Sequence, residues 1–170
     1  MKLAFRQKSD RPRPKSSAPE IAPHFALGRR GEEMALAHLE RAGYRMVAAN
    51  FSAPIGRNTL GAIVNAEIDV VAYDGPTLCF VEVKTRASDK FAPPQVNVDL
   101  RKRRQIVRAA RAYRRMLGLM SAPYRYDVVA VVLPIQKEGE PANKSRIELL
   151  KNFWTEDVLR KRNWHEPYWD

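Results

Sequence analysis

The stretch EIDVVAYDGPTLCFVEVKTR, residues 67–86, decides the fold of this chain. Two apolar runs, 67–73 and 78–85, flank the sequence DGPT (74–77), whose residue types favour a tight turn. Both runs are rich in valine and aromatic residues, as strands are. The stretch therefore predicts an antiparallel β-hairpin.

Charged residues interrupt the second strand of this hairpin on one side, at Glu82 and Lys84. If the turn places Tyr73 opposite Leu78, the same register places Asp69 opposite Glu82. Strand alternation then predicts a charged face made of Glu67, Asp69, Glu82 and Lys84. The other face is predicted to carry Ile68, Val70, Val81 and Val83.

Two carboxylates that face each other across a strand pair repel each other. At an effective dielectric of about 20, two unit charges about 5 Å apart cost roughly 3 kcal/mol. Lys84 can offset part of this repulsion, and Mg²⁺ (or Mn²⁺), which takes oxygen ligands, can offset more. Asp69 and Glu82 are therefore candidate metal ligands, with Lys84 as a catalytic cation. The alternative is an ordinary ion-pair cluster on the surface of the sheet.

The rest of the chain predicts a mixed β-sheet with helices packed on it, an α/β fold. A helical period begins at Leu27 and stops at Gly43. A second helix is expected over 99–118, with Asp99 as its N-cap. Further strands are expected in three places: 44–51, 124–133 and, at an edge, 146–150. Residues 52–66 are rich in turn formers and predict a long loop or an inserted hairpin.

Both predicted helices carry an apolar stripe that would face the core. The first stripe is Leu27, Gly31, Met34, Ala35, Leu39 and Ala42; the second is Leu100, Ile106, Val107, Ala110, Tyr113 and Leu117. Glu32 projects from the apolar side of the first helix, and a carboxylate that faces a core needs a partner. It either reaches water at the rim or reaches Asp69 and Glu82 as a third candidate catalytic residue and metal ligand.

The composition indicates a single globular domain with extensions. The chain has 170 residues, 45% of them hydrophobic, which is enough for one core. A single cysteine excludes a disulfide framework and a Cys-rich zinc site. No window resembles a signal peptide or a membrane span, so we expect a cytoplasmic protein. We divide the chain into a flexible basic arm (1–23), an α/β domain (24–154) and a C-terminal tail (155–170).

The charge balance indicates a polyanionic partner. Thirty Lys and Arg against nineteen Asp and Glu leave a formal net charge of +11, and nucleic acid is the commonest partner of such a protein. The predicted second helix concentrates this charge, with arginines along one side at positions 101, 104, 108, 111 and 115. The alternative is a solvated helix face, since arginine is also a good helix former.

Four stretches resemble the YraN family of small bacterial proteins: GRRGEEMALAHLERAGYRMVAANF (28–51), EIDVVAYDGPTLCFVEVKTR (67–86), RKRRQIVRAARAYRR (101–115) and YRYDVVAV (124–131). The resemblance implies a restriction-endonuclease-like fold with an αβββαβ core, similar to archaeal Holliday junction resolvases. It covers about residues 27–133. The chain departs from the family pattern in a longer segment at 52–66, which ends in Ala66 where a glycine is usual.

The resemblance also implies the nuclease pattern PD-(D/E)xK. Glu82 and Lys84 match its ExK pair, Asp69 the metal-binding acid before it, and Glu32 the acid on the first helix. Lys102 matches a lysine at the start of the second helix, nearest the site. We therefore expect a Mg²⁺- or Mn²⁺-dependent endonuclease that acts on structured or branched DNA. The analogy with resolvases, which act on two-fold-symmetric junctions, favours a homodimer.

The expected site has a catalytic group, a secondary member and a basic surface. The catalytic group is Asp69, Glu82, Lys84 and Glu32, and Glu67 is the secondary member. The residues expected to bind nucleic acid are Arg86, Arg101, Lys102, Arg104, Arg108 and Arg111. Two alternatives stay open: a nuclease fold that grips nucleic acid without cutting it, and an adaptor that docks on a DNA repair or replication complex through Trp154, Trp164 and Trp169. Packing of this tail onto the sheet is the simpler explanation of its tryptophans.

Overall fold

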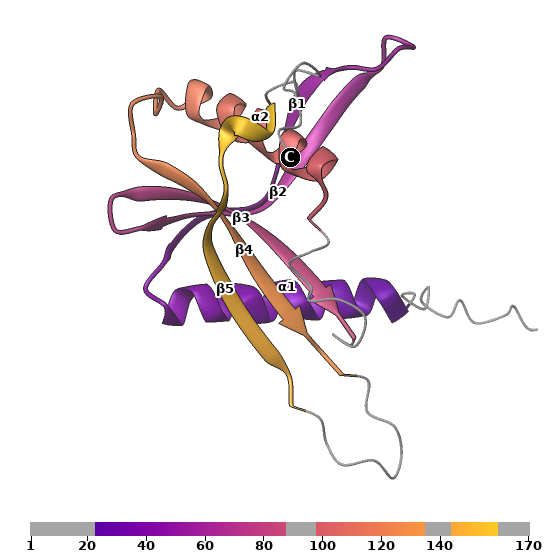
Figure 1. Ribbon diagram of the computed structural model, residues 1–170, viewed down its shortest axis with the longest axis vertical. Helices are drawn as coiled ribbons and strands as arrows, with labels where there is room; N and C mark the ends of the chain where they lie inside the picture. Colours follow the sequence, from indigo (N-terminus) through magenta and orange to yellow (C-terminus); the bar gives the residue numbers. More distant parts are fainter. Residues whose placement is uncertain (1–22, 88–97, 135–143, 160–170) are drawn as a thin grey trace, which may run out of the picture.

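The computed structural model describes residues 23–87, 98–134 and 144–159, which form a five-stranded mixed sheet with a helix on each face (Figure 1). The elements are α1 (Pro23–Arg41), β1 (Arg45–Arg57), β2 (Ile63–Asp74), β3 (Thr77–Arg86), α2 (Leu100–Met116), β4 (Tyr124–Val132), β5 (Arg146–Trp154) and η2 (Glu156–Leu159). The strands lie in the order β1-β2-β3-β4-β5; β3 and β4 are parallel and the other neighbours antiparallel. The predicted restriction-endonuclease-like α/β core is confirmed, with β5 added at its edge.

Several sequence predictions fall on parts of the chain that the structure does not describe. The basic arm lies there apart from Pro23, and so do residues 160–170 of the tail, with Trp164 and Trp169. Within the described ranges, no helix combines the length and the apolarity needed to cross a membrane.

The two helices cover opposite faces of the sheet. On one face, Ala35 and Leu39 of α1 pack against β2, β3 and β4. On the other, Ile106 and Tyr113 of α2 pack against the same strands and β1. The predicted stripes are wrong at their ends: Ala42, Leu100 and Leu117 are exposed. Ala42 follows the last residue of α1, and the other two are the first residue and the C-cap of α2.

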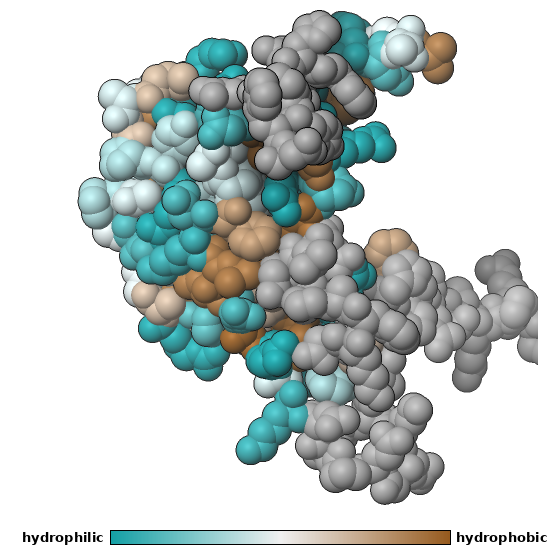
Figure 2. Space-filling model, viewed as in Figure 1, coloured by the Kyte–Doolittle hydropathy of each residue, from teal (hydrophilic) through white to brown (hydrophobic). Residues whose placement is uncertain are grey.

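The segment 52–66 forms an inserted hairpin, the second of the two predicted alternatives. β1 and β2 pair as far as Arg57 and Ile63, and the Asn58 side chain accepts hydrogen bonds from the Leu60 and Ala62 amides to close the turn. The hairpin projects from the body of the molecule (Figure 1) and carries hydrophobic residues at its end (Figure 2). Leu60 at this tip is 90% exposed.

Strands β2 and β3 separate in the middle of the sheet. Their predicted register is confirmed up to the Val70–Val81 pair, where the ladder stops. Beyond it β3 continues beside β4, whereas β2 continues beside β1 toward the projecting hairpin (Figure 1). We call this divergence the fork; Asp69 lies on its β2 side and Glu82 on its β3 side. The fork provides a local opening in an otherwise continuous sheet.

The alternation of side chains along β2 breaks at the fork. Ile68 packs in the cluster on the α2 side, whereas Val70 packs on the α1 side. The predicted grouping of Ile68 with Val70, Val81 and Val83 is therefore wrong. Across from the break, Asn50 of β1 adopts φ 53°. Asn50 and Asp69 are skipped together, with no register shift between the Ala49–Val70 and Phe51–Ile68 pairs, and Ile68 and Val71 both face α2.

The start of the predicted tail packs on the domain. Trp154 ends β5 and stacks on Tyr126 of β4, with ring centroids 5.4 Å apart. Behind it, η2 lies against α2: the Arg104 Nε donates to the Val158 carbonyl oxygen at 2.6 Å, and Arg111 forms an ion pair with Glu156. Trp154 is consequently a core residue and is not available as a docking side chain.

Candidate functional site

The fork gathers four charged side chains on the α2 face of the sheet. Glu82 comes from β3 and is only 1% exposed. Its Oε1 lies 2.7 Å from the Nζ of Lys84, two residues along the same strand and on the same face. Its Oε2 lies 3.1 Å from the Nζ of Lys102, which comes from the first turn of α2. A buried carboxylate is thus held between two ammonium groups.

Asp69 occupies the opposite side of the fork. Its Oδ2 accepts a hydrogen bond of 2.7 Å from the backbone amide of Val83. This bond replaces the ladder bonds that β2 and β3 lose where they separate, so the carboxylate acts as a bridge across the opening. Its Oδ1 lies 4.0 Å from Lys102 Nζ. The two predicted acids therefore meet on one cation.

Lys102 is the group on which these oxygens converge. The Asp99 side chain caps α2 by accepting a 2.7 Å hydrogen bond from the Lys102 amide, as the predicted N-cap requires. The capped first turn aims the Lys102 side chain at the fork. Besides both carboxylates, its Nζ contacts the Glu67 carbonyl oxygen, to which it donates at 3.4 Å. Lys102 thus lies beside Asp69 and Glu82, and its predicted contact with nucleic acid stays a prediction.

The electrostatics of the fork follow from burial of like charges. Burial, followed by the Glu82 charge, raises the pKa of Asp69 from its ordinary value of 3.8 to about 7, against the opposing effect of Lys102. Burial lowers the pKa of Lys102, but the charges of Glu82 and Asp69 outweigh it and bring that pKa above its ordinary value. Lys102 thus stays protonated at neutral pH, while Asp69 exchanges its proton near neutrality.

The donor set at the fork fits a small divalent cation. Glu82 Oε2 is buried and forms an ion pair with Lys102, but among the described residues it accepts no hydrogen bond of good geometry. With Asp69 Oδ1 and the Glu67 carbonyl oxygen it forms an all-oxygen set. Mg²⁺ binds proteins through one or two carboxylates and keeps several waters. Within the described ranges no three Asp, Glu, His or Cys side chains form a metal-binding group, so water would complete the coordination.

Two predicted acids do not join Asp69 and Glu82. Glu32 lies on α1, which packs on the opposite face of the sheet from Lys102. The α1 backbone is fixed there by a close approach of Gly31 to Thr85. A metal-binding group of three acids is not formed in the described part of the chain, so Glu32 does not complete one with Asp69 and Glu82. The Glu67 side chain is exposed; its backbone carbonyl accepts from Lys102, and its charge helps to raise the pKa of Lys102.

The predicted basic surface divides into two sets. Arg86, Arg101 and Arg108 are exposed. Arg104 and Arg111 are bound to η2 through the Val158 carbonyl oxygen and the Glu156 carboxylate. The helical spacing correctly places the arginines along α2 but does not show that η2 covers part of it. The exposed set is what remains for an external anion.

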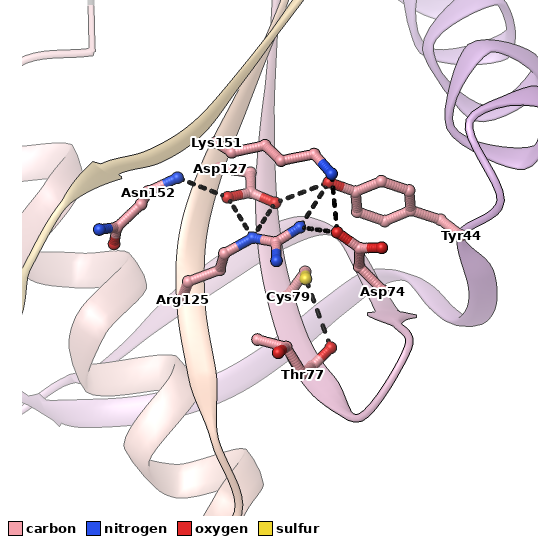
Figure 3. A network of polar contacts seen from close by, with 8 residues as sticks. All are labelled: Tyr44, Asp74, Thr77, Cys79, Arg125, Asp127, Lys151 and Asn152. Carbon is pink, nitrogen blue, oxygen red and sulfur yellow. Dashed lines mark hydrogen bonds and ion pairs between the residues drawn. The ribbon is translucent and has the colours of Figure 1, made fainter.

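A second buried charge cluster lies on the α1 face, near the β2–β3 turn (Figure 3). Asp127, fully buried on β4, accepts hydrogen bonds from Arg125 Nε at 3.0 Å, from Tyr44 Oη at 3.2 Å and from the Asn152 amide at 2.8 Å. Arg125 also bonds Asp74 at 2.5 Å. Opposite charges are paired throughout, which indicates a structural role.

Sequence reasoning missed this second cluster, although the alternation of Arg125 and Asp127 along β4 signals a pair on one face. Cys79 borders the cluster and donates to the Thr77 carbonyl oxygen at 3.4 Å (Figure 3). Burial, followed by the Asp127 charge, raises the pKa of its thiol to about 12. Since only the thiolate is an effective nucleophile, this raised pKa argues against Cys79 as a nucleophile at neutral pH.

The sheet order and the two covering helices define the chain as an α/β protein with a restriction-endonuclease-like core. Residues 31–131 match the model of a family described as "Uncharacterised protein family UPF0102". The chain belongs to this family, which is the YraN family that its motifs resemble. The match spans the elements from α1 to β4, including every residue of the fork.

Individual relatives agree with the family match. A UPF0102 protein of Syntrophus aciditrophicus is 42% identical over 129 residues, which are 76% of this chain and 88% of the relative. A UPF0102 protein of Geobacter sulfurreducens is 42% identical over 107 residues, 63% of this chain and 76% of the relative. One from Chlorobium limicola is 35% identical over 134 residues, 79% of this chain and 95% of the relative.

Proposed function

We propose that this protein is a Mg²⁺- or Mn²⁺-dependent endonuclease that hydrolyses phosphodiester bonds in structured or branched DNA. The observation that carries the proposal is the convergence of Asp69 and Glu82, from two separating strands, on one positive charge. Burying such a pair is costly for the fold. A site that binds a cation for chemistry gives a reason for it, because perturbed and paired carboxylates of this kind cluster at functional sites.

Each residue of the fork would have a separate role that follows from its position. Asp69 and Glu82 would hold the cation, next to the Glu67 carbonyl oxygen. When bound, a divalent cation supplies a water of lowered pKa and neutralises charge on the phosphodiester. Lys84 is 26% exposed while its Nζ is anchored on Glu82. Its ammonium can therefore donate to a phosphate oxygen and stabilise the charge that develops there.

The exposed arginines support DNA as the substrate. Arg101 adjoins Lys102 on the first turn of α2, Arg108 lies two turns further, and Arg86 ends the strand that carries Glu82. A phosphate backbone bound by these side chains would run close to the fork. The net charge of +11 supplies long-range attraction for a polyanion.

The test is cleavage of plasmid, linear, flayed and four-way DNA by the purified protein in Mg²⁺ or Mn²⁺. Glu82→Gln should abolish cleavage, whereas Glu148→Gln, an exposed substitution of the same kind on β5, should leave it unchanged. Branched DNA should be cut faster than linear duplex. Absence of cleavage by the wild type, or equal rates for wild type and Glu82→Gln, would contradict the proposal.

A second candidate function is nucleic-acid binding without cleavage. The observation in its favour is that Lys84 and Lys102 already neutralise the two carboxylates. Both candidates predict that Arg108→Met lowers the slope of log affinity against log salt by about 1, because one phosphate contact is lost. Arg111→Met, whose guanidinium is paired with Glu156, should leave the slope unchanged. Mn²⁺ binding and DNA cleavage would favour the endonuclease, whereas DNA binding with neither of them would favour the protein that binds without cutting.

A further inference from the structure

The ammonium of Lys102 occupies the position that a cation at the fork would take. Its Nζ lies 3.1 Å from Glu82 Oε2, 4.0 Å from Asp69 Oδ1 and 3.4 Å from the Glu67 carbonyl oxygen. These are the three oxygens that fit a divalent metal. An ammonium ion prefers the same oxygen acceptors, so one group of atoms serves either cation.

Two cations on the same oxygens repel each other in this arrangement. Mg²⁺ binds oxygen at about 2.0–2.1 Å, so an ion on Glu82 Oε2 would lie no more than about 5 Å from an ammonium that is 3.1 Å from the same atom. Separate oxygens for the metal ion and for the ammonium would relieve this repulsion, but here both cations use the same oxygens. Lys84 does not create the same conflict, because it contacts the other oxygen, Oε1.

The Lys102 ammonium can move away from the carboxylates toward another anion. Its side chain is 29% exposed, and a four-carbon stem allows the ammonium to swing without movement of the helix. Arg101, the next residue on the same turn, is exposed. A DNA phosphate drawn to this turn offers the ammonium a new anion as it leaves the old ones.

We propose that Lys102 is a displaceable internal counterion that links DNA binding to metal binding at the fork. It neutralises Asp69 and Glu82 in the free protein, and it releases them when a phosphate attracts it. The inference rests on the proposed function, because it assumes that these oxygens bind a metal. Linkage then requires that DNA tighten metal binding and that metal tighten DNA binding by the same factor.

The test measures Mn²⁺ binding to the full chain at pH 8 from the electron paramagnetic resonance signal of free Mn²⁺, with and without a short DNA duplex. Lys102→Met keeps the length of the side chain and removes the charge. It should bind Mn²⁺ at least about tenfold more tightly than the wild type without DNA, a factor typical of coupled sites. DNA should tighten binding by the wild type and have little effect on the variant.

Arg101→Met is the matched control, because it removes one exposed positive charge from the same turn without touching the carboxylates. It should alter Mn²⁺ affinity far less than Lys102→Met does. Lys102→Gln, which keeps a hydrogen-bond donor, serves if the methionine variant does not fold. Urea unfolding adds a second readout: Mn²⁺ should stabilise the Lys102 variants more than the wild type.

Equal or weaker Mn²⁺ binding by both Lys102 variants, or equal tightening by Arg101→Met, would overturn the inference. If the wild type still cuts DNA in that case, the proposed nuclease function stands and only the counterion role fails. If no variant binds Mn²⁺ and the wild type does not cut, both ideas fail together. The two failures are therefore distinguishable.

Discussion

Replacing Gly31 with alanine tests how closely α1 approaches β3. A Cβ added at Gly31 would lie 1.8 Å from Thr85 Oγ1 and 2.7 Å from both Thr85 Cβ and Cγ2. Rotation of the threonine side chain can remove the Oγ1 and Cγ2 contacts. It cannot remove the contact with Cβ, which is fixed by the strand backbone. The helix and the strand must therefore separate to accept a methyl group.

The expected magnitude is a balance of two effects. Alanine in the interior of a helix is more favourable than glycine by up to about 1 kcal/mol. Overpacking a tight interface costs about 1–3 kcal/mol, and the upper end applies because the 2.7 Å contact survives any rotamer. Gly31→Ala should therefore lower the free energy of unfolding by about 2 kcal/mol.

Urea denaturation followed by circular dichroism measures this difference. Gly28→Ala is the matched control on the same helix, since its added Cβ meets nothing within 4 Å, and it should be neutral or stabilising. Thr85→Ala in the Gly31→Ala background should restore part of the loss, because two of the three close contacts disappear. A Gly31→Ala protein as stable as the wild type would refute the close packing of α1 on β3.

Three further predictions concern carboxylates, two of them buried and one exposed. The pKa of Asp69 is raised to about 7 in the fold, so between about pH 4 and pH 7 the folded state binds a proton that the unfolded state has lost. The free energy of unfolding of the wild type should therefore fall relative to that of Asp69→Asn as pH rises from about 4 to about 7, and the difference should stay constant above pH 7. Urea unfolding measures both, and a difference that does not change with pH would contradict this. Asp127→Asn removes the buried countercharge of Arg125 and should cost about 3 kcal/mol, the low end for a broken buried pair because Asp74 remains. Glu148→Gln, exposed on β5, should change the free energy of unfolding by less than about 0.5 kcal/mol.

Local signals made the order of elements predictable. The DGPT turn and the alternation around it specify the β2–β3 hairpin, and its register holds to Val70–Val81. Asp99 caps α2 as expected because an N-cap depends on four consecutive residues, here 99–102, and not on tertiary contacts. Such features need only the sequence in a short window, and the structure confirms them.

The fork was not predictable from alternation, because the point where two strands part is set by packing on both faces. A strict period of two places Ile68 with Val70, yet the bend sends them to opposite cores. Helical spacing likewise gives the side of α1 on which Glu32 lies, but not its depth relative to the sheet. The contacts of Lys102 depend on how α2 docks across residues far away in the chain.

The contact between η2 and α2 has a consequence for how this helix meets a ligand. Glu156 forms an ion pair with Arg111, and the Val158 carbonyl oxygen accepts a hydrogen bond from Arg104. The helix therefore does not depend on a nucleic acid to offset the repulsion among its guanidinium groups. It can remain a rigid rod in the free protein. Under the proposed function, binding of DNA would then begin from a preorganised surface and would spare the entropy that a segment folding upon contact loses.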